Sequence, residues 1–222
     1  MKTTVKQIQQ AVGTTADGIF GAKTLAAVAA RLGVTASLEA VQSRVGAKPD
    51  GIFGQETAGK IKSALGLGWP SQAEVRSGKS AFGRAGDESN LVNISTPYPL
   101  FYDGTALKTI RVHKLIASAV QNALTDVLAY YGIEQIKKLG LDQYSGCFNY
   151  RNSTNGSTLS MHAWGVALDF AAATNTYKMK KPQATLSRQE CDMWWRIWEK
   201  HGAVSLGRER NYDWMHLQFA TL

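Results

Sequence analysis

The N-terminal third of the chain contains an internal repeat, and this repeat restricts the possible folds more than any other feature. Ile8 to Val34 aligns without gaps with Val41 to Leu67, an offset of 33 residues. Each copy predicts a short helix, an Asp-Gly turn and a second helix that begins near Gly21 to Thr24 or Gly54 to Thr57. Asp-Gly suits a tight turn because glycine reaches positive φ easily and aspartate accepts local backbone hydrogen bonds. We therefore expect two small helical hairpins that are stable only when packed together.

The spacing Gln-x7-Asp-Gly-Ile-Phe-Gly-x2-Thr occurs twice, from Gln9 to Thr24 and from Gln42 to Thr57. We expect the two Ile-Phe pairs, Ile19–Phe20 and Ile52–Phe53, to fill the apolar core of the hairpins. The motif resembles the peptidoglycan-binding helical domain found at the ends of many cell-wall hydrolases. This resemblance covers residues 1–67 and implies peptidoglycan as a partner. In that family the second helix runs almost directly into the second glutamine motif, whereas RLGVTASLEA intervenes here, so no wall-contacting residue is assigned.

Composition places the whole chain among globular proteins. Its 222 residues are 44% hydrophobic and 19% charged, enough for one substantial domain and one small domain. No apolar run approaches the roughly 20 residues of a membrane span, so no membrane span is expected. The first residues, MKTTVKQIQQ, lack the apolar core of a secretory signal. We therefore expect synthesis in the cytoplasm, and release by another component if the protein acts outside.

The net charge of +8 favours polyanionic partners, which include nucleic acid, an anionic envelope surface and a cell-wall polymer. The sequence has no basic tail and no Arg-rich stripe with interleaved aromatic residues, so we expect no nucleic-acid binding. Cys147 and Cys191 are the two thiols of the chain. Because a cytoplasmic origin disfavours disulfides, we expect both to be free.

The remaining chain predicts a linker over residues 68–90, rich in Gly and Ser, and a second domain over 91–222. Apolar residues recur at helical spacing from Val112 to Tyr131. Ser187 and Glu190 suggest a capping box for a helix that ends at Gly202. Strands are expected around YPLFYDG, CFNYRN, HAWGVALDFAA and WMHLQFA. The expected fold class is α+β, with a small all-α repeat domain and a second domain whose helices cover a mainly antiparallel sheet.

Two of the four histidines have structural interpretations. His201 is expected in the last turn of a helix, where an imidazole complements the C-terminal carbonyls. His113 is expected on the solvated face of the first turn of the long helix. His162 and His216 instead lie in apolar, strand-like segments, where an unpaired polar group costs about 1–3 kcal/mol. Each of these two therefore needs a partner.

Asp169 can be that partner. Period-two alternation places Asp169 on one face of its strand with Ala167 and Gly165, whose small size leaves space beside the carboxylate. The same alternation places His216 and Gln218 on one face of the last strand. Two imidazoles and a carboxylate suit zinc, which lowers the pKa of bound water. The alternative is a buried hydrogen-bonded cluster without metal, because buried polar groups are routinely satisfied in that way.

A catalytic zinc site also needs a proton acceptor, and Asp213, three residues before His216, is the candidate. The pattern Ser160-x-His162-x2-Gly165-x-Ala167-x-Asp169, followed by Asp213-x2-His216, resembles the signature of the zinc D-alanyl-D-alanine peptidase family, which includes VanY-like enzymes and phage L-alanyl-D-glutamate endopeptidases. The match extends over most of Tyr98 to Phe219 and includes GCFNYRN. The resemblance implies zinc ligands and a general base, which are His162, Asp169 and His216 for the metal and Asp213 for the base.

The same resemblance implies that Arg151 orients the substrate and steadies an oxyanion, and that the Ser160 hydroxyl supports a ligand or faces the substrate. With the repeat domain, it indicates a monomeric phage endolysin that acts on the cell wall in the periplasm after release from the host cytoplasm. The expected bond is L-alanyl-D-glutamate, with D-alanyl-D-alanine or a cross-link as the alternative.

Two other functions have to be weighed against the zinc peptidase. A cysteine peptidase would use Cys147 with His162 or His216. The sequence SGCFNY disfavours it, since a reactive cysteine usually sits in an electropositive site, often at a helix N-terminus, and this segment looks like a strand. A catalytically silent zinc protein is the other reading. Asp213 argues against it, because a structural site has no use for an unliganded carboxylate.

Overall fold

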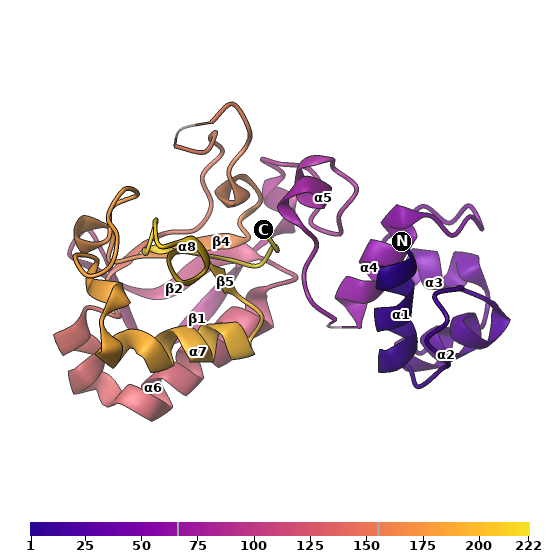
Figure 1. Ribbon diagram of the computed structural model, residues 1–222, viewed down its shortest axis with the longest axis horizontal. Helices are drawn as coiled ribbons and strands as arrows, with labels where there is room; N and C mark the ends of the chain where they lie inside the picture. The colour runs from indigo at the N-terminus through magenta and orange to yellow at the C-terminus, as the bar shows by residue number, and fades with distance from the viewer. Residues whose placement is uncertain (66, 155) are drawn as a thin grey trace. The chain divides into compact units, whose positions relative to one another are not determined.

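The computed structural model describes residues 1–65, 67–154 and 156–222. The chain forms two compact units, Met1–Gly83 and Arg84–Leu222. Figure 1 shows the first unit in indigo to purple and the second in the colours from magenta to yellow. Each unit is described separately below.

The N-terminal unit contains the two expected helical hairpins. The first hairpin consists of α1 (Lys2–Ala11) and α2 (Ala22–Leu32), and the second of α3 (Leu38–Val45) and α4 (Gln55–Ala64). A single apolar core is built from both copies, with Ile8, Val28, Ala29, Val41 and Ile61 fully or almost fully buried. Because each hairpin supplies only part of this core, neither buries its apolar face alone.

In the two Ile-Phe pairs, the phenylalanines are packed as expected and the isoleucines are not. Phe20 and Phe53 stack on each other, with ring centroids 3.9 Å apart and an interplanar angle of 10°. Ile19 and Ile52, however, are 67% and 68% exposed. The expectation that both residues of each pair fill the core is therefore wrong for the isoleucines, because the turn directs neighbouring side chains to opposite sides.

The N-terminal unit continues past Leu67 into the segment expected as a linker. Helix α5 (Gln72–Arg76) begins with a capping box, in which Ser71 and Glu74 satisfy each other's backbone N–H groups. Trp69 and Phe82 stack with ring centroids 5.7 Å apart, and Phe82 is buried. Part of this Gly- and Ser-rich segment therefore has its own ordered packing, because capping and aromatic contacts offset its poor helical periodicity.

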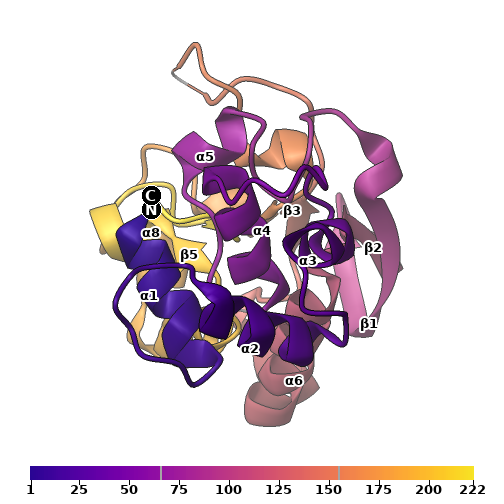
Figure 2. The same ribbon diagram turned by 90° about the vertical axis from the view of Figure 1, so that its right-hand side faces the viewer.

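The C-terminal unit has two antiparallel sheets, which agrees with the expected α+β class. A long hairpin joins β1 (Leu91–Tyr102) to β2 (Thr105–His113), and Figure 2 shows the two strands side by side. A second sheet has the strand order β3-β4-β6-β5, and all its neighbours are antiparallel. Its strands are β3 (Tyr144–Gly146), β4 (Ala167–Phe170), β5 (Val204–Ser205) and β6 (His216–Gln218).

Helices cover one face of the second sheet. Figure 1 shows α6 (Ala117–Leu139) and α7 (Asp192–Lys200) side by side on the same side of the strands. Phe170 of β4 points to this side, with ring centroids 5.4 Å from Trp194 and 5.7 Å from Trp198. The remaining elements are α8 (Leu206–Arg210) and the 3-10 helices η1 (Glu88–Asn90), η2 (Met161–Trp164), η3 (Ala172–Thr174), η4 (Thr185–Ser187) and η5 (Gln189–Cys191).

The long helix begins later than its apolar periodicity predicts. Val112 and His113 belong to β2, and α6 begins only at Ala117 and is interrupted at Gly132, whose φ is 66° and ψ is 162°. His113 is 1% exposed, and its Nδ1 accepts a hydrogen bond from Leu115 N. The expectation of a solvated His113 is therefore wrong, since a buried strand and a buried helix face share the same apolar spacing over a few residues.

Two other local predictions also differ from the structure. Ser187 lies in η4, where its hydroxyl donates to Ala184 O, and α7 begins at Asp192 without a side-chain cap, so the predicted capping box is absent. The CFNYRN segment follows β3 instead of forming a strand. His201, directly after α7, places its Nε2 2.8 Å from Asp126 Oδ2, so its side chain has a structural partner, which is a carboxylate of α6 and not the expected helix carbonyls.

Within the described part of the chain, no helix combines the length and the apolar character that crossing a membrane requires.

Candidate metal centre

Asp169 and His216 are placed by the central pair of strands in the second sheet. The antiparallel register sets Asp169 of β4 directly opposite His216 of β6. Directly paired residues point to the same face of a sheet, and Phe170 alternates to the helix-covered face. The predicted shared face of the carboxylate and the imidazole is therefore present, and it lies away from α7.

His162 reaches the same place from a 3-10 turn and not from a strand. It lies in η2, where the Ser160 hydroxyl accepts a hydrogen bond from His162 N at 3.4 Å. Gly165 ends this turn with φ 66°, and a Cβ there would stand 2.5 Å from Leu91 Cδ2. Gly165 thus closes the turn against β1, and its expected role of clearing space beside the Asp169 carboxylate is wrong.

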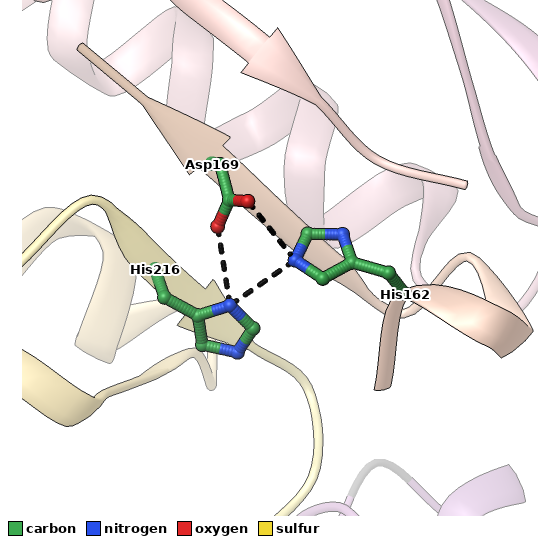
Figure 3. Close-up of side chains that lie close together, drawn as sticks. All are labelled: His162, Asp169 and His216. Carbon is green, nitrogen blue, oxygen red and sulfur yellow. Dashed lines mark hydrogen bonds and ion pairs between the residues drawn. The ribbon is translucent and has the colours of Figure 1, made fainter. Parts of the chain in front are cut away.

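The three side chains converge tightly. Figure 3 shows both rings and the carboxylate directed at one point. His162 Nε2 lies 3.2 Å from His216 Nδ1 and 3.2 Å from Asp169 Oδ2. His216 Nδ1 lies 3.1 Å from Asp169 Oδ1. All three residues are buried, and together they can hold a metal ion.

The outward nitrogens of both rings already have acceptors. His162 Nδ1 lies 2.6 Å from Cys147 O, and His216 Nε2 lies 3.1 Å from Gln218 Oε1. A carbonyl or amide oxygen can only accept, so these nitrogens carry the ring protons. Neutral rings therefore direct lone pairs from His162 Nε2 and His216 Nδ1 toward each other and toward the carboxylate. Three acceptors face one another without a donor, which is unfavourable unless a cation or a proton lies between them.

The spacing suits a small tetrahedral cation. Bonds of about 2.0–2.1 Å to nitrogen and oxygen ligands place neighbouring donor atoms about 3.3 Å apart in a tetrahedron. Here the two ring nitrogens lie 3.2 Å apart, and each lies 3.1–3.2 Å from a different oxygen of the Asp169 carboxylate. Each ring is also oriented by a hydrogen bond from its other nitrogen, as is usual for metal-binding histidines.

With both rings neutral, the ionised Asp169 carboxylate gives the cluster a net negative charge. Burial opposes ionisation of Asp169, but when the rings of His162 and His216 are protonated their charge and hydrogen bonds outweigh it and hold the pKa of Asp169 below its usual value. Burial likewise opposes protonation of His216, yet the Asp169 carboxylate accepts a hydrogen bond from the protonated ring, attracts its charge and so raises the pKa of His216. The carboxylate thus stays ionised and favours positive charge at the point where the three side chains meet.

Asp213 lies beside this cluster in an unusual environment. Its φ is 54°, in the left-handed region, and its backbone N–H donates to Tyr177 O at 3.0 Å. The residue is 7% exposed, and within the described residues its Oδ1 has no hydrogen-bond partner. Burial raises the pKa of Asp213 to about 6, although the nearby charges of His216, His162 and Arg151 oppose the shift. A buried carboxyl oxygen without a partner, beside a potential metal site, is available for proton transfer.

Arg151 and Ser160 have different positions relative to this carboxylate. The Arg151 charge acts on Asp213, and Arg151 Nη1 donates to Asn152 O at 3.2 Å. Ser160 is 7% exposed and caps η2. The serine therefore supports the turn that carries His162, and the arginine charge acts on the Asp213 carboxyl group.

The cysteines do not form a reactive site. Cys147 and Cys191 are free and buried. Burial raises the pKa of both thiols, that of Cys191 to about 11, which disfavours the nucleophilic thiolate. Cys147 contributes through its backbone instead, because its carbonyl accepts from His162 Nδ1 while its Sγ donates to Gly165 O at 3.3 Å.

Sequence reasoning missed two groups that orient the rings. Gln218 had a detectable signal, since it lies two residues after His216 in the same strand and therefore shares its face. The Cys147 carbonyl had none, because any residue type supplies a backbone oxygen. Comparisons of the chain with protein-family models, with curated proteins and with solved structures found no match.

Proposed function

We propose that the protein is a zinc-dependent peptidase that hydrolyses an amide bond in the stem peptides of peptidoglycan. The observation that carries this proposal is the meeting of the buried His162 Nε2, His216 Nδ1 and Asp169 carboxylate at 3.1–3.2 Å. All three are acceptors when the rings are neutral and carry their protons on the outer nitrogens. A purely hydrogen-bonded cluster would pair acceptors with donors. A bound cation satisfies all three at once.

The donor set favours zinc over other metals. Two imidazoles and one carboxylate match catalytic zinc sites, which keep a fourth position for water or substrate. Calcium and magnesium prefer sites made of oxygen donors alone. Asp213 Oδ1, which has no hydrogen-bond partner among the described residues, favours a catalytic site over a structural one, since a structural site has no use for such a group.

The chain's own residues divide the proposed reaction between them. A bound zinc ion supplies Lewis acidity, which lowers the pKa of water and polarises a carbonyl. His162, Asp169 and His216 hold the metal. Asp213 accepts a proton from the attacking water and returns it to the leaving amine nitrogen. The Arg151 guanidinium orients the substrate and stabilises negative charge that develops on the carbonyl oxygen.

The substrate class rests on the resemblances of both units. The pattern from Ser160 to His216 resembles zinc peptidases that cleave bacterial wall peptides, and the N-terminal repeat resembles peptidoglycan-binding domains. A wall-binding unit raises the local concentration of the peptidase at its substrate. We therefore propose a phage-type endolysin that cleaves the L-alanyl-D-glutamate bond.

Treatment with a strong chelator, followed by addition of zinc, tests the metal. Wall-lytic activity should disappear and return, and activity that survives complete metal removal would contradict the proposal. Mass spectrometry of the fragments released from purified peptidoglycan identifies the bond. A new N-terminal D-glutamate supports the endopeptidase, whereas release of D-alanine alone indicates a carboxypeptidase on the same site.

A further inference from the structure

Gln218 is buried beside the proposed metal centre, and the proposed reaction gives it no role. It is 1% exposed, and its strand β6 is paired on both sides, with Ala167 of β4 and Val204 of β5 as its partners. Its backbone is therefore fixed by two ladders. Ala167 stands directly opposite, and its small side chain leaves room for the glutamine amide on the face that carries Asp169 and His216.

The orientation of the Gln218 amide is decided by Ala220. Gln218 Nε2 donates to Ala220 O at 2.5 Å, which leaves Oε1 facing His216 Nε2 at 3.1 Å. In the flipped amide, Oε1 would face the Ala220 carbonyl at the same distance, and two acceptors would repel each other. Hydrogen bonding thus permits one amide orientation, and in this orientation an acceptor faces the outer nitrogen of His216.

That acceptor selects one of two possible states of the neutral His216 ring. With the proton on Nε2, the ring donates to Gln218 and directs the Nδ1 lone pair at the site. With the proton on Nδ1, the ring would donate to Asp169 Oδ1, 3.1 Å away, and its lone pair would lie on Nε2, directed away from the site. Without Gln218 the carboxylate would favour the second state, because it is the stronger acceptor.

We infer that Gln218 is a positioning residue that keeps His216 in its Nε2–H tautomer, so that Nδ1 is available as a metal ligand. The inference rests on the proposed zinc site. Each of the two rings then donates its outer N–H to one oriented oxygen, which is a backbone carbonyl for one ring and a side-chain amide for the other. The Cys147 carbonyl fixes His162, which binds through Nε2, and a side chain fixes His216, which binds through Nδ1.

Two substitutions separate positioning from simple structural support. Gln218→Met removes both the acceptor and the donor at nearly unchanged volume. Gln218→Glu keeps an acceptor toward His216 but loses the N–H that bonds Ala220 O. Both variants lose the same structural hydrogen bond, so both should unfold at a lower temperature, and only Gln218→Met should lose the tautomer. Gln121→Met is the matched control, because Gln121 is an exposed glutamine on α6.

The tautomer is read directly from long-range ¹H–¹⁵N correlation spectra of the metal-free full-length protein in alkaline buffer. We expect the Nε2–H pattern for His216 in the wild type, in Gln218→Glu and in Gln121→Met, and the Nδ1–H pattern in Gln218→Met. Zinc affinity, measured by competition with a chelator, should fall roughly 10- to 100-fold in Gln218→Met, the usual effect of removing a group that orients a ligand. It should fall much less in Gln218→Glu.

An Nε2–H pattern with wild-type zinc affinity in Gln218→Met would overturn the inference, as would equal losses in both Gln218 variants. If Gln218→Met does not fold, Gln218→Glu decides alone: a folded variant with the Nδ1–H pattern would overturn it, since the acceptor is still present. A wild-type protein that takes up no zinc contradicts the proposed function, and the tautomer still decides the role of Gln218.

Discussion

Each unit of the protein buries a polar motif, and the two motifs differ in how their hydrogen bonds are completed. In the repeat unit, Gln9 Nε2 donates to Asp17 Oδ1 at 2.7 Å and to Ile19 O at 2.9 Å, while Gln9 Oε1 accepts from Gly18 N at 2.9 Å. The second copy repeats the arrangement around Gln42 at 2.9–3.0 Å. In the C-terminal unit, the neutral rings of His162 and His216 and the Asp169 carboxylate present only acceptors to one another.

The comparison distinguishes the glutamine clusters, whose hydrogen bonds the chain itself completes, from the histidine cluster, which could hold a metal ion. The amide of each glutamine explains the spacing that the two repeats share. It forms hydrogen bonds to the Asp and Gly of the loop and to the Thr of the second helix, and so connects the loop to both helices. The hydroxyl oxygens of Thr24 and Thr57 lie 3.1 Å and 3.2 Å from the same amide nitrogens and share their two protons with the other acceptors. Such a cluster is complete without a ligand. The histidine cluster could hold a metal ion, because a cation or a proton between its acceptors would satisfy them.

The largest expected effect concerns Asp213, which lies next to the histidine cluster. Asp213→Asn keeps the size of the side chain but removes the proton acceptor, so kcat should fall roughly 10²- to 10⁴-fold. Zinc content, measured by atomic absorption, should not change. Near-wild-type turnover on purified peptidoglycan would exclude Asp213 as the base.

Zinc should stabilise only the C-terminal unit, which contains His162, Asp169 and His216. A ligand at about 1,000 times its Kd adds about 4 kcal/mol to the free energy of unfolding. Calorimetry with and without zinc should show that zinc raises the unfolding temperature of the C-terminal unit. Tryptophan fluorescence identifies the transition of this unit, which contains Trp164, Trp194, Trp195, Trp198 and Trp214. His162→Ala should abolish the shift. A zinc-dependent shift that survives in His162→Ala would place the metal elsewhere.

Removing the hydrogen bonds of the Gln42 amide should destabilise only the repeat unit. Gln42→Leu leaves the Gly51 N–H and the acceptors around it without partners, which should cost about 1–3 kcal/mol of unfolding free energy. Zinc affinity and the unfolding of the C-terminal unit should be unchanged. Thr57→Val, which removes one acceptor from the same cluster, provides a milder control. An effect of Gln42→Leu below that of Thr57→Val would contradict the central place of the glutamine.

The smallest expected effect is the acid sensitivity of the repeat unit. The hydrogen bonds from Gln9 and the Ile19 backbone lower the pKa of Asp17, and those from the Ile52 backbone and Gln42 lower that of Asp50. A carboxyl group whose pKa is lower in the folded state stabilises the fold above its unfolded pKa of about 3.9, and this contribution is lost as the pH falls through the folded value.

The double variant Asp17→Asn, Asp50→Asn should weaken this dependence, since asparagine still accepts the bonds but does not titrate. Thermal unfolding of the repeat unit between neutral and strongly acidic pH measures the difference. Identical acid sensitivity in the wild type and the variant would show that other carboxyl groups dominate.

Several features of the site were predictable from local spacing. The period-two pattern placed Asp169 opposite the apolar Leu168 and Phe170, and the register of β4 and β6 agrees. The same reasoning assigned His162 to a strand and His113 to a helix, and both were wrong. Short apolar segments fit a strand, a helix or a 3-10 turn equally well, so contacts made elsewhere in the chain decide between them.

The sequence by itself determined the repeat, the antiparallel α+β class of the second unit and the residues that can supply metal donors, because each depends on residue type and spacing. Only the tertiary structure decided that His162 approaches from a turn, that Ile19 and Ile52 are exposed, and which nitrogen of each ring faces Asp169. The last point depends on Cys147 O and on the amide orientation that Ala220 O imposes on Gln218. Backbone carbonyls carry no sequence signature, so the folded chain alone brings them to the rings that they orient.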